Sequence, residues 1–154
     1  MSFTLIDRND LSESLESSSN ASSTLIVDVR SESEYAEGHI ASAINVPSTL
    51  WEDPETAINL KRSNPSKTKF VFHCKLSQQR GPTCAKIFAE RLSDANLDSI
   101  PEMCVIVLLS IKIFIILINN ITFSYSAVLK EGFAGWYDEY GGVAGKVEYG
   151  PSGK

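Results

Sequence analysis

The residues in this sequence best suited to chemistry are a cysteine and an arginine separated by five residues. Cys74 follows the apolar run Lys69–His73, and Arg80 stands directly before a Gly-Pro pair. A cysteine thiolate is a nucleophile. A guanidinium offers a planar fork of N–H groups that matches two oxygens of a tetrahedral anion. The pair therefore indicates covalent transfer of a phosphate-like group, with Cys74 and Arg80 as the catalytic residues.

The elements around Cys74 predict how the two residues are positioned. The run 69–73 is typical of a short buried strand, and a helix is expected from Gly81 to about Leu92, with Pro82 in its first turn. A loop that leads from a strand into a helix aims successive N–H groups at one point, which binds an oxyanion and favours a thiolate. The residues expected to form this loop are Lys75, Leu76, Ser77, Gln78, Gln79 and Arg80.

The rest of the chain predicts an α/β fold. Short apolar runs near residues 25–29, 44–47 and 127–129 indicate further strands, and helical segments are expected at 11–15, 33–36, 50–61 and after 131–136. Residues 17–23 are rich in serine and are expected to form a loop. Because the strands are continuously apolar and alternate with helices, we expect a central parallel sheet with helices on both faces.

Length, charge and cysteine content limit the class of protein. The 154 residues, 43% hydrophobic and 21% charged, suit a single domain. A net charge of −5 argues against nucleic-acid binding, which needs basic patches. Three cysteines and no apolar N-terminal segment favour a reducing compartment, so we expect a cytoplasmic or nuclear protein. The spacing of cysteines and histidines suits no metal site, and we expect neither metal nor cofactor. The oligomeric state stays open.

Several separated motifs resemble the signature of the rhodanese fold. They are Val27–Arg30, Tyr35–Ile40, Ala43–Pro47, and the closing turn with Gly132, Phe133, Gly135 and Trp136. The loop from His73 to Pro82 is similar to that of the cell-division-cycle type of dual-specificity phosphatases and of the related eukaryotic arsenate reductases. The resemblance covers about residues 4–100 and 126–142, and it implies one rhodanese-like domain over residues 1–154.

The resemblance implies a phosphatase that forms a phosphocysteine on Cys74 and acts on a phosphorylated protein or a small phosphate ester, in the tyrosine or dual-specificity class. An arsenate reductase that uses glutathione as co-substrate is the alternative. The loop is one residue longer than in sulfurtransferases of this fold, which makes sulfur transfer less favoured. Lys75 and Gln79 stand where related loops often carry a carboxylate, so the general acid is unidentified. A non-catalytic binding module therefore also remains open.

Other polar residues have supporting roles in this interpretation. The resemblance implies that Asp28 and Arg30 form a framework above the sheet and that His39 makes structural hydrogen bonds. His73 is expected to orient the loop rather than transfer protons. Cys84, inside the helix that follows the loop, is interpreted as a core residue rather than a resolving thiol.

An apolar insertion at about 101–126 does not fit this plan. Met103 to Ile118 is nearly continuously apolar, interrupted by Ser110 and Lys112. A membrane span needs about 20 apolar residues, so membrane association is disfavoured. A second possibility is extra buried strands or a hydrophobic helix. We favour a third, that the segment is a retained intron, because its Ile, Phe, Asn, Lys and Tyr bias is what A/T-rich codons yield.

Overall fold

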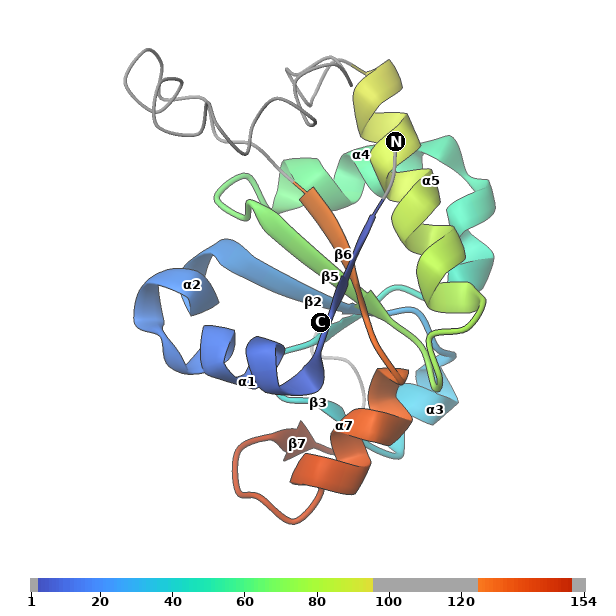
Figure 1. The fold of residues 1–154 in the computed structure, drawn as a ribbon. Helices are drawn as coiled ribbons and strands as arrows, with labels where there is room; N and C mark the ends of the chain where they lie inside the picture. The colour runs from blue at the N-terminus through green and yellow to red at the C-terminus, as the bar shows by residue number, and fades with distance from the viewer. Residues whose placement is uncertain (1–2, 96–124, 151–154) are drawn as a thin grey trace.

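The structure, a computed structural model, describes residues 3–95 and 125–150 (Figure 1). Strands and helices alternate along most of the chain. In order they are β1 (Thr4–Ile6), α1 (Arg8–Glu16), α2 (Ser18–Ser23), β2 (Thr24–Asp28), α3 (Glu32–Ala36), β3 (His39–Ile40), β4 (Ile44–Asn45), the 3₁₀ helix η1 (Ser48–Glu52), α4 (Pro54–Ser63), β5 (Lys69–His73), α5 (Arg80–Asp94), β6 (Tyr125–Leu129), α7 (Gly132–Tyr140) and β7 (Val147–Glu148).

The central sheet has five strands in the order β1-β6-β5-β2-β4, and each neighbouring pair is parallel. The predicted α/β fold with a parallel sheet is therefore confirmed. β5 lies in the middle, and its last residue, His73, is paired in register with Asp28, the last residue of β2. The carboxyl end of β5, where Cys74 follows, thus lies at the centre of one edge of the sheet. β3 and β7 form a separate antiparallel pair.

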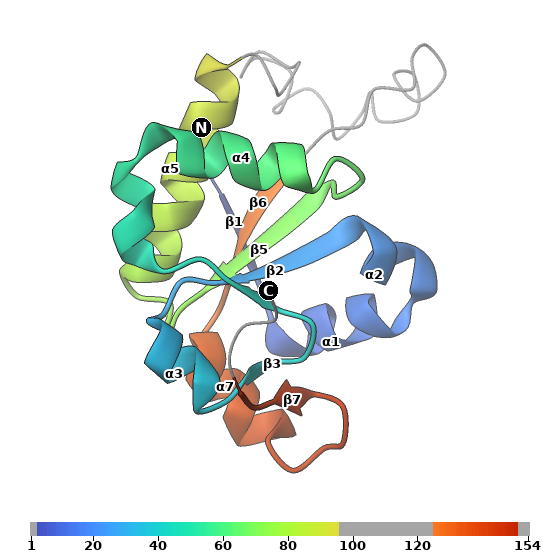
Figure 2. The ribbon, with the colours of Figure 1, turned by 180° about the vertical axis from the view of Figure 1, so that it is seen from behind.

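Helices cover both faces of this sheet, as Figures 1 and 2 show. Phe70 and Phe72 of β5 pack with η1, α4 and α5 in one apolar cluster. Val71, between them, packs with α1 and α7 in a second cluster on the opposite face. Because alternate side chains enter two different cores, the three central residues of β5 are all apolar. This explains why the sequence shows continuous apolar runs instead of alternation.

The N-terminal region differs from the prediction. β1 has only three residues and was not expected. α1 begins at Arg8 with Asp7 as its cap, whereas the sequence favoured a later start. The serine-rich segment forms helix α2 rather than a loop. Two of its hydroxyl groups, on Ser22 and Ser23, donate back to carbonyls three residues earlier, which satisfies polar groups within the short helix.

The apolar run 103–118 lies outside the described residues. Among the helices of residues 3–95 and 125–150, none has both the length and the apolar character that crossing a bilayer requires.

Candidate active site

The loop Cys74–Arg80 connects β5 to α5 at the carboxyl edge of the sheet (Figure 1). The Cys74 residue is only 5% exposed and its thiol is free. Ser77 has a φ of 50°, in the left-handed region, which turns the chain back on itself. Its hydroxyl oxygen accepts a hydrogen bond from the backbone N–H of Cys74 at 3.4 Å. The loop therefore closes over the cysteine before the helix begins.

Gly81 allows α5 to begin directly against the loop. A Cβ atom at this position would lie 3.3 Å from the Ser77 hydroxyl oxygen and 3.5 Å from the backbone nitrogen of Cys74. The first distance is tight and the second is an ordinary van der Waals contact, so the loop packs directly against Gly81. The N-terminus of a fifteen-residue helix is thereby brought beside the thiol, where its dipole favours negative charge.

Arg80 is held by a carboxylate that the sequence analysis did not single out. Its Nη1 donates to Glu34 Oε2 at 2.8 Å and its Nη2 donates to Glu34 Oε1 at 3.0 Å, a bidentate pair. Both side chains are about one third exposed. This pairing with Glu34, and to a lesser extent the nearby Cys74 sulfur, raises the pKa of Arg80. The guanidinium thus lies within electrostatic reach of the thiol in a fixed orientation.

Glu34 is itself fixed by the start of α3. Its carboxylate accepts hydrogen bonds from the N–H and the hydroxyl of Ser31, while the Ser31 hydroxyl accepts from the N–H of Glu34. This capping box was visible in the sequence as Ser31-x-x-Glu34. The hydrogen bonds from Arg80 lower the pKa of Glu34 to about 2. Glu34 is therefore ionised at neutral pH and cannot act as a proton donor in this arrangement.

Asp28 and Arg30 form a buried pair next to the loop. Arg30 Nη2 donates to Asp28 Oδ2 at 2.6 Å and also to the carbonyl of Gly38 at 2.7 Å. The guanidinium lies over the ring of Phe133, 4.1 Å from its centroid. These contacts join the ends of β2, α3 and α7 below the loop, which is a framework arrangement.

His73 is completely buried between this pair and the loop. Its Nε2 lies 3.8 Å from Asp28 Oδ2, and its Nδ1 lies 3.4 Å from the Cys74 carbonyl oxygen. Burial lowers the pKa of His73, so the imidazole is neutral at neutral pH. A neutral ring without solvent access can orient the loop but has no route to exchange protons with a substrate.

The remaining loop residues face solvent. Lys75, Leu76, Gln78 and Gln79 are exposed, and Ser77 is half-buried. None of these side chains is a carboxylic acid, so the loop itself offers no proton donor for a leaving group. The exposed amine of Lys75 adds positive charge at the mouth of the site, which attracts anionic substrates.

Cys84 lies inside α5 and is only 2% exposed. Burial, with a smaller effect from the Cys74 charge, raises the pKa of Cys84 to about 12. Its thiol packs in the same apolar cluster as Phe72 and Phe88. A thiol in this state is not a nucleophile at neutral pH, which agrees with its interpretation as a core residue.

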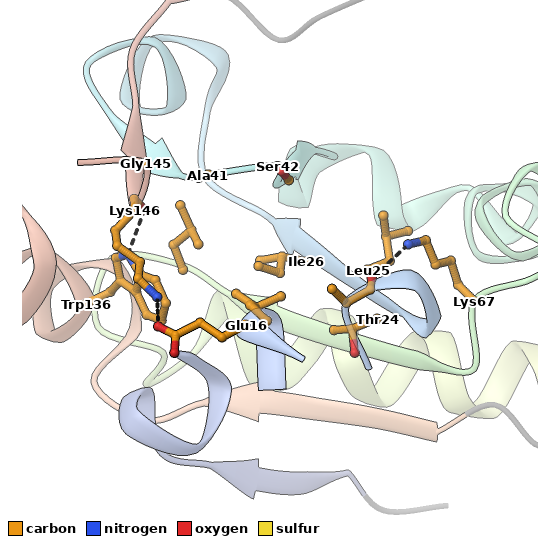
Figure 3. A pocket seen from close by; sticks show the side chains of 13 residues that line it. Glu16, Thr24, Leu25, Ile26, Ala41, Ser42, Lys67, Trp136, Gly145 and Lys146 are labelled. Atoms are coloured by element: carbon orange, nitrogen blue, oxygen red, sulfur yellow. Dashed lines mark hydrogen bonds and ion pairs between the residues drawn. The ribbon is translucent and has the colours of Figure 1, made fainter. Parts of the chain in front are cut away.

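A pocket of about 470 Å³ lies apart from the loop, between α1, β2, α7 and the segment before β7 (Figure 3). Ile26, Ile40 and Trp136 are among its apolar lining residues. At its edge Lys146 donates to Glu16 Oε1 at 2.7 Å. No residue of the Cys74–Arg80 loop lines this pocket. The pocket is therefore separate from the Cys74–Arg80 loop.

Comparison with known proteins agrees with this architecture. The family model of the rhodanese-like domain matches residues 9–139, most of the chain. The chain belongs to the rhodanese-like domain family. A yeast structure described as a protein tyrosine phosphatase of the rhodanese family is similar over 97% of this chain and 94% of its own, with a TM-score of 0.70 and 24% identity. The structure of an As-Sb reductase from Leishmania major is similar over 92% of this chain and 81% of its own, with a TM-score of 0.63 and 23% identity. At these identities the likeness shows the fold.

Two further relatives are more similar in sequence and are named for two different activities. Dual specificity phosphatase Cdc25 of Arabidopsis thaliana is 38% identical over 74 residues, which are 48% of this chain and 49% of that protein. Arsenate reductase 2.2 of Oryza sativa subsp. japonica is 38% identical over 74 residues, 48% of this chain and 55% of that protein. The chain thus spans about half the length of each relative. These comparisons support the expected subgroup, in which phosphatases and arsenate reductases share one fold.

Proposed function

We propose that this chain is a cysteine-dependent phosphatase acting through a phosphocysteine on Cys74. The observation that carries the proposal is the arrangement of Cys74 and Arg80 at the two ends of one loop. The thiol lies at the N-terminus of α5, and the guanidinium is oriented by Glu34. A nucleophile beside preorganised donors for three phosphoryl oxygens is what phosphoryl transfer requires.

The proposed reaction has two steps. In the first, the Cys74 thiolate attacks phosphorus, the S–P bond forms, and the ester P–O bond breaks to release an alkoxide or phenoxide, which takes its proton from solvent. In the second, water attacks phosphorus, the S–P bond breaks, and inorganic phosphate and the thiolate are released. Arg80 and the loop amides hold the transferring oxygens in both steps. Because Glu34 is ionised and the loop carries no acid, we expect esters of low-pKa alcohols, such as aryl phosphates, to be the best substrates.

Arsenate reduction is the second candidate, and the missing proton donor favours it. Arsenate in its monoanionic form carries two hydroxyl protons, so one of its oxygens can leave as water without an acid from the protein. Cys74 Sγ would attack arsenic, the S–As bond would form, and one As–O bond would break to release water that carries both of these protons. A glutathione thiolate would then attack Cys74 Sγ to form a mixed disulfide, leaving the S–As electron pair on arsenic as arsenite. A second glutathione would restore the thiol and release glutathione disulfide, so two glutathiones supply the two electrons.

Parallel assays of the purified chain test the proposal. We expect hydrolysis of p-nitrophenyl phosphate, or glutathione-dependent reduction of arsenate, and loss of either activity in Cys74→Ser. The variant should still bind phosphate, because the donors are the loop amides and Arg80 rather than the thiol. Turnover that survives in Cys74→Ser would contradict the assignment of the nucleophile. Phosphate binding with no turnover of either substrate would instead indicate a non-catalytic binding module.

A further inference from the structure

The start of α7 contacts the catalytic loop, although the proposed mechanism makes no use of it. The N–H of Phe133 donates to the carbonyl of Cys74 at 2.8 Å, and the N–H of Ala134 donates to the carbonyl of Lys75 at 2.9 Å. The first N–H groups of a helix have no partner within the helix. Here two of them bind the first two carbonyls of the loop, so α7 fixes the orientation of two consecutive peptide groups.

The orientation of these peptides decides where their N–H groups point. Each peptide is trans, so its N–H points opposite to its C=O. The Cys74 carbonyl points toward α7, and the N–H of Lys75 in the same peptide therefore points away from it. The Lys75 carbonyl fixes the N–H of Leu76 in the same way. α5 and α7 approach the loop from opposite sides (Figures 1 and 2), so both N–H groups point to the side from which α5 and Arg80 come.

Gly132 is what allows α7 to come this close. A Cβ atom on Gly132 would lie 2.4 Å from the Cys74 carbonyl oxygen and 2.7 Å from the Lys75 carbonyl oxygen. Both are backbone atoms that cannot move aside as a flexible side chain could. Its φ of 58° also lies in the left-handed region, which favours glycine. Two independent reasons therefore exclude a side chain at the point where α7 meets the loop.

We propose that the first turn of α7 aims the N–H groups of Lys75 and Leu76 at the bound oxyanion, and that Gly132 is the positioning residue that makes this possible. The inference rests on the oxyanion cradle of the proposed function. It assigns a role in the site to the Gly132-Phe133 motif, which lies 58 residues after Cys74 in the sequence. Gly132 does not touch the substrate and acts through the peptides that do.

Two variants remove this support in different ways. Gly132→Ala places a methyl group against the loop carbonyls. Ala134→Pro deletes the N–H that binds the Lys75 carbonyl, and a proline in a first helical turn removes no bond within the helix. A small displacement of catalytic groups lowers turnover by on the order of 100-fold. We expect a loss of this size in both variants, and phosphate binding that is about tenfold weaker or more, because oriented donors are lost.

The matched control is Gly141→Ala at the other end of α7. Its Cβ would lie 2.6 Å from a backbone carbonyl, that of Tyr137, which is remote from the loop. This variant should lose stability but bind phosphate as the wild type does. The decisive readout is a ¹H–¹⁵N NMR titration with inorganic phosphate. The amide signals of Lys75 and Leu76 should shift in the wild type and Gly141→Ala, and much less in the other two variants.

The outcomes separate this inference from the proposed function. If Gly132→Ala and Ala134→Pro both bind phosphate as tightly as the wild type does, α7 has no positioning role. This conclusion holds whether or not the wild type turns over a substrate. If Gly132→Ala does not fold, Ala134→Pro alone decides. If the wild type binds phosphate without turnover, the proposed enzyme activity fails while the binding comparison still tests α7. A wild type that binds no phosphate overturns the cradle and both proposals.

Discussion

Arg80 serves two opposing demands in this site. Glu34 holds its guanidinium in one orientation through two hydrogen bonds, which removes much of the entropy loss on binding an anion. The same carboxylate places a negative charge near the oxyanion site, which weakens anion attraction. The guanidinium has five N–H groups, and Glu34 occupies one on each terminal nitrogen. The remaining donors stay available, so we expect orientation to outweigh charge.

Glu34→Gln tests this balance. The amide keeps the shape of the side chain but loses the charge and one of the two acceptors. We expect kcat to fall by about tenfold or more, because Arg80 loses its fixed orientation, while KM changes less. Steady-state kinetics of p-nitrophenyl phosphate hydrolysis or arsenate reduction measure the effect, with Glu32→Gln, exposed on the same helix, as control. A faster or tighter-binding Glu34→Gln would show that the carboxylate competes with the substrate.

The same pair predicts a pH dependence of stability. The pKa of Glu34 is lowered from 4.5 to about 2 in the folded chain. A lowered carboxyl pKa stabilises the fold above the unfolded-state value, and this contribution is lost as pH falls from 4.5 toward 2. Because the pair is partly exposed, we expect only about 1 kcal/mol at neutral pH. Urea unfolding of wild type and Glu34→Gln should differ by this amount at pH 7, and the difference should shrink as the pH falls from 4.5 toward 2. An equal difference at both pH values would contradict the assignment.

At the scale of elements, the strand, loop and helix that carry the site could be predicted because their signals are local. The run Lys69–His73 combines aromatic and β-branched residues, and the Gly-Pro pair marks the start of α5, so both elements match the structure closely. Glu34 was not predicted as a site residue, because its role depends on a contact between distant parts of the sequence. Its capping box is local and visible, but its contact with Arg80 spans 46 residues and depends on how α3 packs beside the loop. The hydrogen bond from the Phe133 N–H to the Cys74 carbonyl was missed because it, too, joins residues far apart in the sequence.

Phe88 is the residue through which α5 is anchored to the sheet. Its ring centroid lies 4.7 Å from that of Phe70 and 5.3 Å from that of Phe72, and the side chain is buried. Truncating a buried aromatic side chain leaves a cavity, so we expect Phe88→Ala to lower the free energy of unfolding by about 3–5 kcal/mol. Urea denaturation measures it. Glu90→Ala, exposed on the same helix, should change it by about 0.5 kcal/mol or less. A loss in Phe88→Ala no larger than this would mean that α5 is anchored elsewhere.

At the scale of the whole molecule, the two described ranges together complete the sheet. β6 pairs with β5 on one side and β1 on the other, so the strand after the apolar segment is central to the fold. The site also needs both ranges, because the Cys74 loop comes from the first and the start of α7 from the second. The fold and the site are therefore built from residues of both ranges, 3–95 and 125–150.

Deletion of residues 103–120 tests whether that segment belongs to the domain. The deletion keeps twelve residues between α5 and β6. They can span about 40 Å when extended, more than twice the radius of gyration of about 15 Å expected for a domain of this length. Fourteen of the eighteen deleted residues are apolar, and burial of each large apolar side chain is worth about 1.5–3 kcal/mol. Both faces of the sheet are already covered by helices, which leaves little apolar surface to receive these side chains.

Because long apolar runs of low charge promote aggregation, we expect the deletion variant to be more soluble than the full chain, with the same phosphate affinity and turnover. Expression yield, thermal unfolding and activity measure this. An insoluble or inactive deletion variant, beside a soluble and active full chain, would show that the segment is part of the core.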